Sequence, residues 1–495
     1  MIPARMRLLC RLSGIAICLA AATPVFAQPS ADILAAQVQD LRQALDAMQA
    51  QVAEARRDAD ALRMKLQAVE AQIAALKGTA APPAPQDPLA RIDAIAQEQD
   101  LIAARVDDHE QTKVASGSKY RVRLSGLVLV NVQGTRGSVD NLDLPLVAVH
   151  PAASDTGGAF SASVRQSFLN VEVFGPKLAG ASTLGDVSFD FFGGFPVTAQ
   201  GVTEPLVRLR TARVSLDWNR ATLVMGQDTP FFSPRSPTSL ASTAYPALSS
   251  AGNLWVWTPQ VHAQRRFAAS DTSAFSLQAG LLDPLTGEPA QEYTRAPTAG
   301  ERTGTPAGAV RAGFQHRIDA DRTIDVGGSG YAGRQTWNAG ETIGSWAIAG
   351  DWNVPFNRFL GVSGEAYHGQ AIAGFGGGAS PSVVFTSPVA ALAEAIPVRS
   401  SGGWVQLKVI PRSRIEFNGA IGVDSPSRDR LLRAVPIGLL DPAAVSRNAS
   451  GFVNAIYQPR SNFLVSLEYR DLWTTGLDEV THRAHHFTFS TGIGF

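Results

Sequence analysis

The feature that most constrains this chain is an alternation of apolar and polar residues that begins near Lys119 and continues to the C-terminus. In the first such segment, for example, Val130 and Val132 flank Asn131. A period of two places successive side chains on opposite faces of a β-strand, so each segment predicts a strand with one apolar and one polar face. Between residues 119 and 495 we count about sixteen such segments.

Short and long connections alternate between these segments, almost without exception. Barrels of the outer membrane have short turns at the periplasmic end and long loops outside, whereas a soluble β-sandwich has no reason to sort its connections by end. An even number of strands also brings both ends of the barrel to the periplasmic side. The sequence therefore predicts an all-β fold over residues 119–495, an antiparallel transmembrane β-barrel of about sixteen strands. Tight turns are predicted at Asn219-Arg220, Pro411-Arg412 and Pro459-Arg460, and long loops at 228–253, 284–306, 370–398 and 425–446.

Two local features refine this expectation. Arg208, Arg210 and Val214 are separated by even numbers of residues, so an unbroken strand would place all three on the same, lipid-facing side. An arginine that faces lipid costs about 2–4 kcal/mol at the membrane midplane. We therefore expect a β-bulge in this strand. Aromatic residues near strand ends are typical of interfacial girdles, and the candidates are Tyr120, Trp218, Trp352, Trp404 and Trp473.

Residues 1–27 have the pattern of a secretory signal peptide. Three arginines precede an apolar core at 12–22, and Val25-Phe26-Ala27 forms a small-residue cleavage site, which places the mature start near Gln28. The apolar core is too short to act as a transmembrane helix. The sequence thus predicts an exported protein.

Cysteine content and charge exclude several function classes. Cys10 and Cys18 both lie in the signal peptide, so the mature chain is expected to have no disulfide, no cysteine metal ligand and no thiol nucleophile. Without the signal peptide the chain has 40 basic and 43 acidic residues, and it has no long basic run. We therefore predict no cofactor, no metal and no nucleic-acid partner.

Residues 28–77 predict a periplasmic coiled coil. From Ala31 to Lys77 apolar residues recur every seven positions, as at Leu34 and Leu41, with a second set four residues later. On a single amphipathic helix packed against a globular domain, the apolar stripe would rotate around the helix by about 20° per heptad. The apolar residues here keep a strict seven-residue repeat, so the stripe does not rotate. The number of helices in the coil stays open. A Pro-rich linker and a short helix, residues 78–118, are expected to join the coil to the barrel.

The heptad pattern leads to a testable prediction. A single helix would leave its apolar stripe in water, so a peptide of residues 31–77 is expected to self-associate and to show helical circular dichroism. Sedimentation at about 100 µM, where coils of six heptads normally associate, tests this. A monomer at that concentration would contradict the prediction.

Three motifs carry a resemblance to a known family. They are Phe189-Asp190-Phe191-Phe192-Gly193-Gly194, Arg208-Leu209-Arg210, and Gly226-Gln227-Asp228 at the start of the third long connection. Together with the N-terminal coil and the terminal phenylalanine, they resemble the DcaP-like group of Gram-negative trimeric outer-membrane porins, relatives of the phosphate-selective porins.

The resemblance implies a homotrimer, and it implies a third loop folded inward as a constriction rather than a disordered surface loop. Candidate constriction residues are Asp228 and Arg235. It also implies that the barrel-assembly machinery reads the last strand, whose outward residues Phe487, Phe489, Ile493 and Phe495 form the assembly signal.

A barrel of sixteen strands leaves an aqueous lumen. Arginines gather in the first, second and fourth strands, and a basic strip would favour anionic solutes such as the carboxylates that the family resemblance implies. If the arginines instead pair with Asp190 and Glu172, the pore would be nearly unselective. The pore-lining candidates are Arg121, Arg123, Arg165, Arg208, Arg210, Arg213, Glu365, Glu416, Glu468 and Arg470.

The sequence thus favours an outer-membrane porin for small hydrophilic solutes, with its coil in the periplasm. An enzyme is disfavoured, because His485 and His486 point to opposite faces of one strand and no GxSxG elbow is present. A structural barrel that tethers the layers of the envelope through its coil remains the alternative.

Overall fold

The computed structural model describes residues 120–153, 155–289, 294–337 and 340–495. The predicted signal peptide (1–27), coiled coil (28–77) and linker with its short helix (78–118) lie outside the described residues. Within the described ranges, no helix is both long and apolar enough to cross a membrane.

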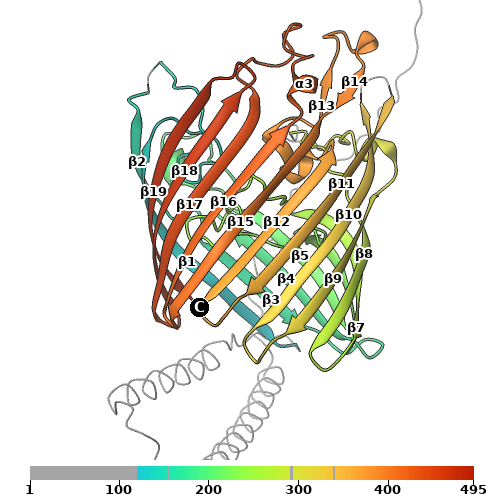
Figure 1. Cartoon of the computed structure of the whole chain (residues 1–495), viewed down its shortest axis with the longest axis vertical. Helices are drawn as coiled ribbons and strands as arrows, with labels where there is room; N and C mark the ends of the chain where they lie inside the picture. Colours follow the sequence, from blue (N-terminus) through green and yellow to red (C-terminus); the bar gives the residue numbers. More distant parts are fainter. Residues whose placement is uncertain (1–119, 154, 290–293, 338–339) are drawn as a thin grey trace, which may run out of the picture. The chain divides into compact units, whose positions relative to one another are not determined.

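The described chain forms one closed antiparallel β-barrel (Figure 1). Successive strands pair from β3 to β12, β12 pairs with β15, and successive strands pair again from β15 to β19. The sheet closes because β1 pairs with β19. Both β2 and β3 pair with β1, on successive stretches, so they are two halves of one interrupted strand. The seventeen strands of the sheet therefore fill sixteen positions in the wall, as the sequence predicted.

The barrel strands vary from six to sixteen residues in length. They are β1 (Val122–Arg136), β2 (Gly158–Ser163), β3 (Phe168–Phe174), β4 (Ser182–Asp190), β5 (Arg208–Asp217), β6 (Ala221–Asp228), β7 (Thr258–Ala268), β8 (Ser273–Leu282), β9 (Ala307–Arg317), β10 (Thr323–Trp337), β11 (Glu341–Pro355), β12 (Leu360–Gln370), β15 (Arg399–Arg412), β16 (Ile415–Pro426), β17 (Val445–Arg460), β18 (Phe463–Gly476) and β19 (Thr481–Gly494). The remaining elements lie in loops: η1 (Gly201–Thr203), η2 (Glu301–Thr303), η3 (Ala373–Phe375), η4 (Gly377–Ala379), η5 (Ala390–Leu392), α3 (Arg428–Leu431) and the hairpin of β13 (Val383–Phe385) and β14 (Ala395–Pro397).

Alternate residues of each strand face the outside and the inside of the barrel. On β1, Val128 is 55% exposed on the outer face, whereas Asn131 and Gln133 are buried on the inner face. Polar residues on the inner face and apolar residues on the outer face are the pattern of a barrel in a membrane. The alternation predicted for this strand is thus confirmed.

The predicted bulge in the strand that carries Arg208 is present. Ser188 of β4 pairs with Thr211 of β5, but the next residue, Phe189, pairs with Leu209, so Arg210 is the extra residue. The bulge turns Leu209 outward and leaves the side chains of both arginines inside, where each contacts Asp190.

Two predicted turns are placed two residues too early. Pro411 and Pro459 belong to β15 and β17, and the turns follow at residues 413–414 and 461–462. In both strands the pairing register shifts around the proline. Proline has no N–H to donate to the ladder, so a bulge at the strand end accommodates it, and the strand then continues.

The connections at the two ends of the barrel also differ from the expected sorting. The short-turn end is as predicted, but at the long-loop end β10 ends at Trp337 with β11 starting at Glu341, and β18 ends at Gly476 with β19 starting at Thr481. These two hairpins pair almost to their tips. Two of the eight connections at that end are therefore short.

Trp404, predicted to belong to an aromatic girdle, does not lie on the outer face. Its side chain points into the barrel and packs against Ala247, Leu248 and Ala251 of the third loop. The parity of β15 places Val405 and Leu407 outside and Trp404 and Gln406 inside. The prediction was wrong because it rested on the position of the residue near a strand end and not on its face.

Closure of the barrel gives the terminal residue a specific structural role. The backbone of Phe495 exchanges two hydrogen bonds with Gly126 of β1, at 2.9 and 3.1 Å. Deleting Phe495 removes the last pair of the closing seam and the end of the predicted assembly signal, so the amount of folded, heat-modifiable barrel in the outer membrane is expected to fall. Unchanged levels at native gene dosage would contradict this role.

Candidate pore lining and constriction

The third loop, residues 229–257, runs inside the barrel from the end of β6 to the start of β7 (Figure 1). Its residues contact the inner faces of β10, β11, β17 and β18 and the segment between β2 and β3. The loop carries few regular backbone hydrogen bonds of its own, so side chains of the wall satisfy many of its polar groups. Four groups of contacts fix its course.

The first group is an ion-pair cluster around Arg235. Its guanidinium contacts Asp351 of β11 at 2.8 Å and Asp325 of β10 at 3.0 Å. Arg311 of β9 binds the same Asp351 carboxylate, at 2.7 and 2.9 Å. Arg235, a predicted constriction residue, is therefore a fixed part of the inner wall, and its charge is balanced there.

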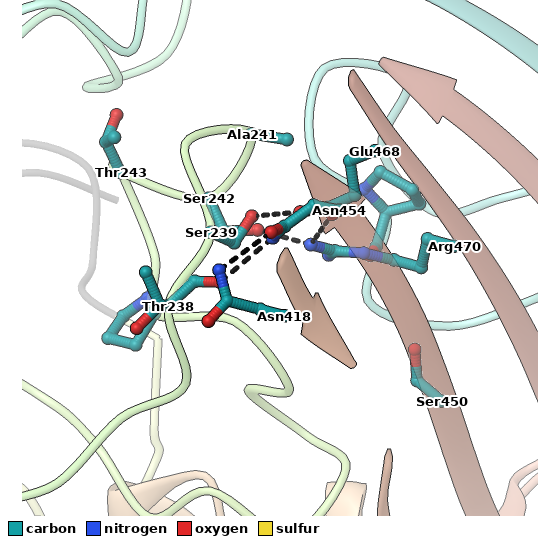
Figure 2. A network of polar contacts seen from close by, with 12 residues as sticks. Thr238, Ser239, Ala241, Ser242, Thr243, Asn418, Ser450, Asn454, Glu468 and Arg470 are labelled. Atoms are coloured by element: carbon teal, nitrogen blue, oxygen red, sulfur yellow. Dashed lines mark hydrogen bonds and ion pairs between the residues drawn. The ribbon is translucent and has the colours of Figure 1, made fainter. Parts of the chain in front are cut away.

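The second group joins the loop to β16, β17 and β18 (Figure 2). Asn454 donates to the carbonyl of Thr238 at 2.9 Å, and the hydroxyl of Ser239 donates to Glu468. Arg470 donates to the hydroxyl of Ser242 and pairs with Glu468 at 2.7 Å. Only 4% of Glu468 and 3% of Arg470 remain exposed. Both predicted pore-lining residues thus hold the loop and do not face open lumen.

The third group centres on Gln166, which sequence reasoning missed. Its amide oxygen accepts hydrogen bonds from the backbone of Thr243 at 2.9 Å and Ala244 at 3.2 Å, and its amide nitrogen donates to the carbonyl of Ala241 at 2.9 Å. Gln166 lies in the gap between β2 and β3, where the strand leaves the sheet. From sequence alone, residues 161–174 predict one continuous strand, and no motif marks Gln166 within it.

The fourth group is apolar. Leu240 of the loop packs on Leu127 and Leu129 of β1, and Ala247, Leu248 and Ala251 pack on Trp404 of β15. Gly252 comes so close to β15 that an added Cβ atom would lie 2.1 Å from the carbonyl oxygen of Gly403. Its φ angle of +96° is also one that residues with side chains rarely adopt.

Most of the arginines that were predicted to form a basic strip are paired with carboxylates. Asp190 accepts from Arg208 at 3.0 and 2.6 Å and lies 3.8 Å from Arg210. The two arginines also donate to the carbonyls of Ala244 and Thr243 in the third loop, at 2.9 and 3.0 Å. This is the paired arrangement that the sequence left open as an alternative.

Aromatic rings surround the same arginines. The guanidinium of Arg208 lies 4.7 Å from the ring of Tyr245 and 4.8 Å from that of Trp257, and Arg210 lies 5.0 Å from Phe168. Arg165 lies between two further rings, those of Phe192 and Phe195, at 4.2 and 4.0 Å. Such rings hold a guanidinium without cancelling its charge.

Except for Arg165, which shares the ring of Phe192 with Arg208, the remaining candidates lie apart from this cluster. Arg213 binds Asp186 at 2.7 Å and Asp228 at 2.5 Å, and 42% of its side chain stays exposed. Three others have partners near their own strands: Arg121 lies over the ring of Phe174, Arg123 pairs with Glu172, and Glu416 pairs with Lys408 at 3.3 Å. Glu365 is fully buried and accepts a hydrogen bond from Ser233 of the third loop. Arg165 pairs with Asp143 of the first loop (137–157) at 2.5 Å.

Sequence comparison does not assign the chain to a family, because no family model matches it and no curated protein matches it in sequence. Among solved structures, the outer-membrane channel DcaP of Acinetobacter baumannii is similar, with 14% identity, a TM-score of 0.56, and alignment over 77% of this chain and 99% of that chain.

Two further solved structures have lower TM-scores. OprB of Pseudomonas putida aligns with 12% identity and a TM-score of 0.47, over 76% of this chain and 94% of that one. The anion-selective porin from Comamonas acidovorans aligns with 10% identity and a TM-score of 0.45, over 76% of this chain and 100% of that one. At such identities the likeness concerns the fold. The closed barrel of sixteen strand positions in this chain thus has a fold similar to that of the outer-membrane channel DcaP.

Proposed function

We propose that this protein is an outer-membrane porin through which small hydrophilic solutes diffuse passively, with a modest preference for anions such as carboxylates. The observation that carries the proposal is the third loop, which lies inside a barrel wide enough for an aqueous channel and is anchored on several sides. An anchored loop narrows the lumen without filling it with a separate domain. In this role Asp228 and Arg235, at the start of the third loop, fix it to the wall through their ion pairs with Arg213 and with Asp325 and Asp351.

Support for the anion preference comes from the charge balance of one cluster, in which Arg165 and Arg208 share the ring of Phe192 and Arg210 lies beside Asp190. The neighbouring cluster of Arg213 with Asp186 and Asp228, which has one excess carboxylate, is counted separately. Three arginines, Arg165, Arg208 and Arg210, face two carboxylates, Asp143 and Asp190. One positive charge is therefore left over in a site lined by aromatic rings, and in a narrow pore with walls of low dielectric a single charge is strongly felt. The pairing also limits the effect, so we expect a weak selectivity and not a strong one.

The remaining expectations belong to the same proposal. We expect a homotrimer whose outer wall contacts outer-membrane lipids, whose last strand is read by the barrel-assembly machinery, and whose N-terminal coil lies in the periplasm. We expect no enzymatic activity. The alternative is a structural tether that links envelope layers through the coil, and this alternative does not require an open lumen.

Single-channel recording separates the two. The purified full-length protein, inserted in a planar lipid bilayer, is expected to produce discrete, long-lived conductance steps that saturate only weakly with salt. A membrane that contains verified folded barrel and shows no steps above the leak would support the tether and overturn the proposal.

A further inference from the structure

The outer face of the barrel carries a group of arginines that lies apart from the charged residues of the lumen. Near the long-loop end of β10, β12 and β15, the side chains of Arg334, Gln370 and Arg399 point away from the lumen. Arg399 donates to the amide oxygen of Gln370 at 3.3 Å, and Arg430 of α3 donates to the same oxygen at 3.3 Å. Two guanidinium groups thus converge on one neutral acceptor.

These arginines differ from those of the lumen in their partners. Within the part of the chain that the structure describes, no ion pair involves Arg334, Arg399 or Arg430, and Arg430 donates otherwise only to the carbonyl of Pro397, at 2.5 Å. Arg334 and Arg399 are exposed. Guanidinium groups remain charged at any relevant pH and match the geometry of phosphate oxygens. The cluster is therefore complementary to an anion with several oxygens.

An apolar groove lies directly beside the cluster. It has a volume of about 770 Å³ and crosses the outer face of β8 to β11, with Leu281, Val310, Trp346 and Ile348 on its walls. The sheet register connects the two features, because Trp346 pairs with Gln370, which in turn pairs with Arg399. Arg334 lies two residues beyond the groove residue Ala332, towards the long loops.

The tilt of the strands sets the relative heights of the two features. The strands of this wall lean, so a row of paired residues that runs from β8 towards β15 climbs towards the long-loop end (Figure 1). The arginine cluster consequently lies closer to the long-loop end of the barrel than the groove does. A charged cluster above an apolar groove fits one amphipathic molecule.

We propose that this part of the wall, the groove with Arg334, Arg399 and Arg430, binds a phosphate-bearing lipid of the outer leaflet. Its phosphate would replace water around the guanidinium groups, and one acyl chain would lie in the groove. Charge complementarity selects this occupant over a second copy of the chain, since the described outer face offers this cluster no matching acidic patch. The inference depends on the membrane location of the barrel and is independent of ion selectivity.

The test uses the purified full-length protein in detergent, with diphosphorylated lipid A as the probe and native mass spectrometry as the readout. We expect one lipid per protomer, and weaker binding at high salt. Replacing both exposed arginines, Arg334→Gln with Arg399→Gln, is expected to weaken binding by about tenfold. Arg447→Gln is the matched control, because Arg447 is also an exposed, outward-facing arginine near the long-loop end, on β17.

A second variant probes the groove without touching the arginines. Gly330→Leu adds a side chain where a Cβ atom meets nothing nearer than 4.0 Å, so the barrel should fold while the groove is filled and lipid A binds less tightly. The proposal is overturned if dephosphorylated lipid A binds as well as the probe, if inorganic phosphate competes at equal concentration, or if Arg447→Gln weakens binding as much as the double variant. It is also overturned if the double variant dissociates an oligomer and leaves lipid binding unchanged, since a second copy would then cover this wall.

Discussion

Replacing Gly252 with leucine is expected to detach the return segment of the third loop from the wall and to raise the single-channel conductance severalfold. The backbone of Gly403 occupies the space that any side chain at this position needs, and backbone atoms cannot rotate away. The positive φ angle adds a strain of about 1–3 kcal/mol for a residue with a side chain. Because the loop contacts Trp404 through the neighbouring Ala251, that packing is expected to be lost as well.

The matched control is Gly194→Leu in the second loop (191–207). Gly194 has a similar φ angle of +105°, but a Cβ atom there would meet nothing within 4 Å. This variant carries the backbone strain alone and should conduct like the wild type. Heat-modifiability on gels verifies that both variants form barrels. A folded Gly252→Leu barrel with wild-type conductance would show that the third loop does not limit the current.

The second large effect is expected from Asp190→Asn, which should increase the preference for anions. Asp190 is fully buried, and its carboxylate balances Arg208 and, less closely, Arg210. An asparagine keeps the volume and an oxygen for the backbone N–H of Phe192, but it leaves two guanidinium groups without their counter-charge. Breaking a buried pair in this way costs about 3–5 kcal/mol of stability, so a lower melting temperature should accompany the change.

Reversal potentials measured under a salt gradient test this second prediction. Asp319→Asn serves as the control, because it removes the same charge from an exposed turn at the short-turn end of the barrel. The complementary variant, Arg208→Ala with Arg210→Ala, is expected to weaken the anion preference and also to destabilise the barrel by leaving Asp190 unpaired. If Asp190→Asn and Asp319→Asn shift the potential equally, the site on β4 and β5 has no special influence on permeation.

The sequence predicted the barrel well because strand alternation is local information. The alternation of apolar and polar residues was enough to place Val128 outside and Asn131 inside. The same alternation would put Arg208 on the outer face with Val214, which required the bulge that the structure places at Arg210. Prolines misled the placement of two turns, because Pro411 and Pro459 read as turn residues when considered alone. Only the pairing partner across the sheet shows that the strands continue past them through a bulge.

The contacts of the third loop could not be predicted in the same way. Which wall residue meets which loop residue depends on partners that are up to 229 positions apart in the sequence, as for Ser239 and Glu468. Parity could show that Arg470 and Glu468 face inward, but not that the loop would bury them. Gln166 carried no signal at all, because its role arises from a local gap between β2 and β3 and not from a motif.

We propose that this barrel is a narrowed, water-filled channel with a small positive excess at its constriction. The zero-current potential of the wild-type protein across a planar bilayer, under a tenfold gradient of potassium chloride, tests that claim most directly. We expect a stable potential with the sign of chloride selectivity, well below the limit for an ideally selective pore because most arginines are paired. A potential with the sign of potassium selectivity would contradict the account.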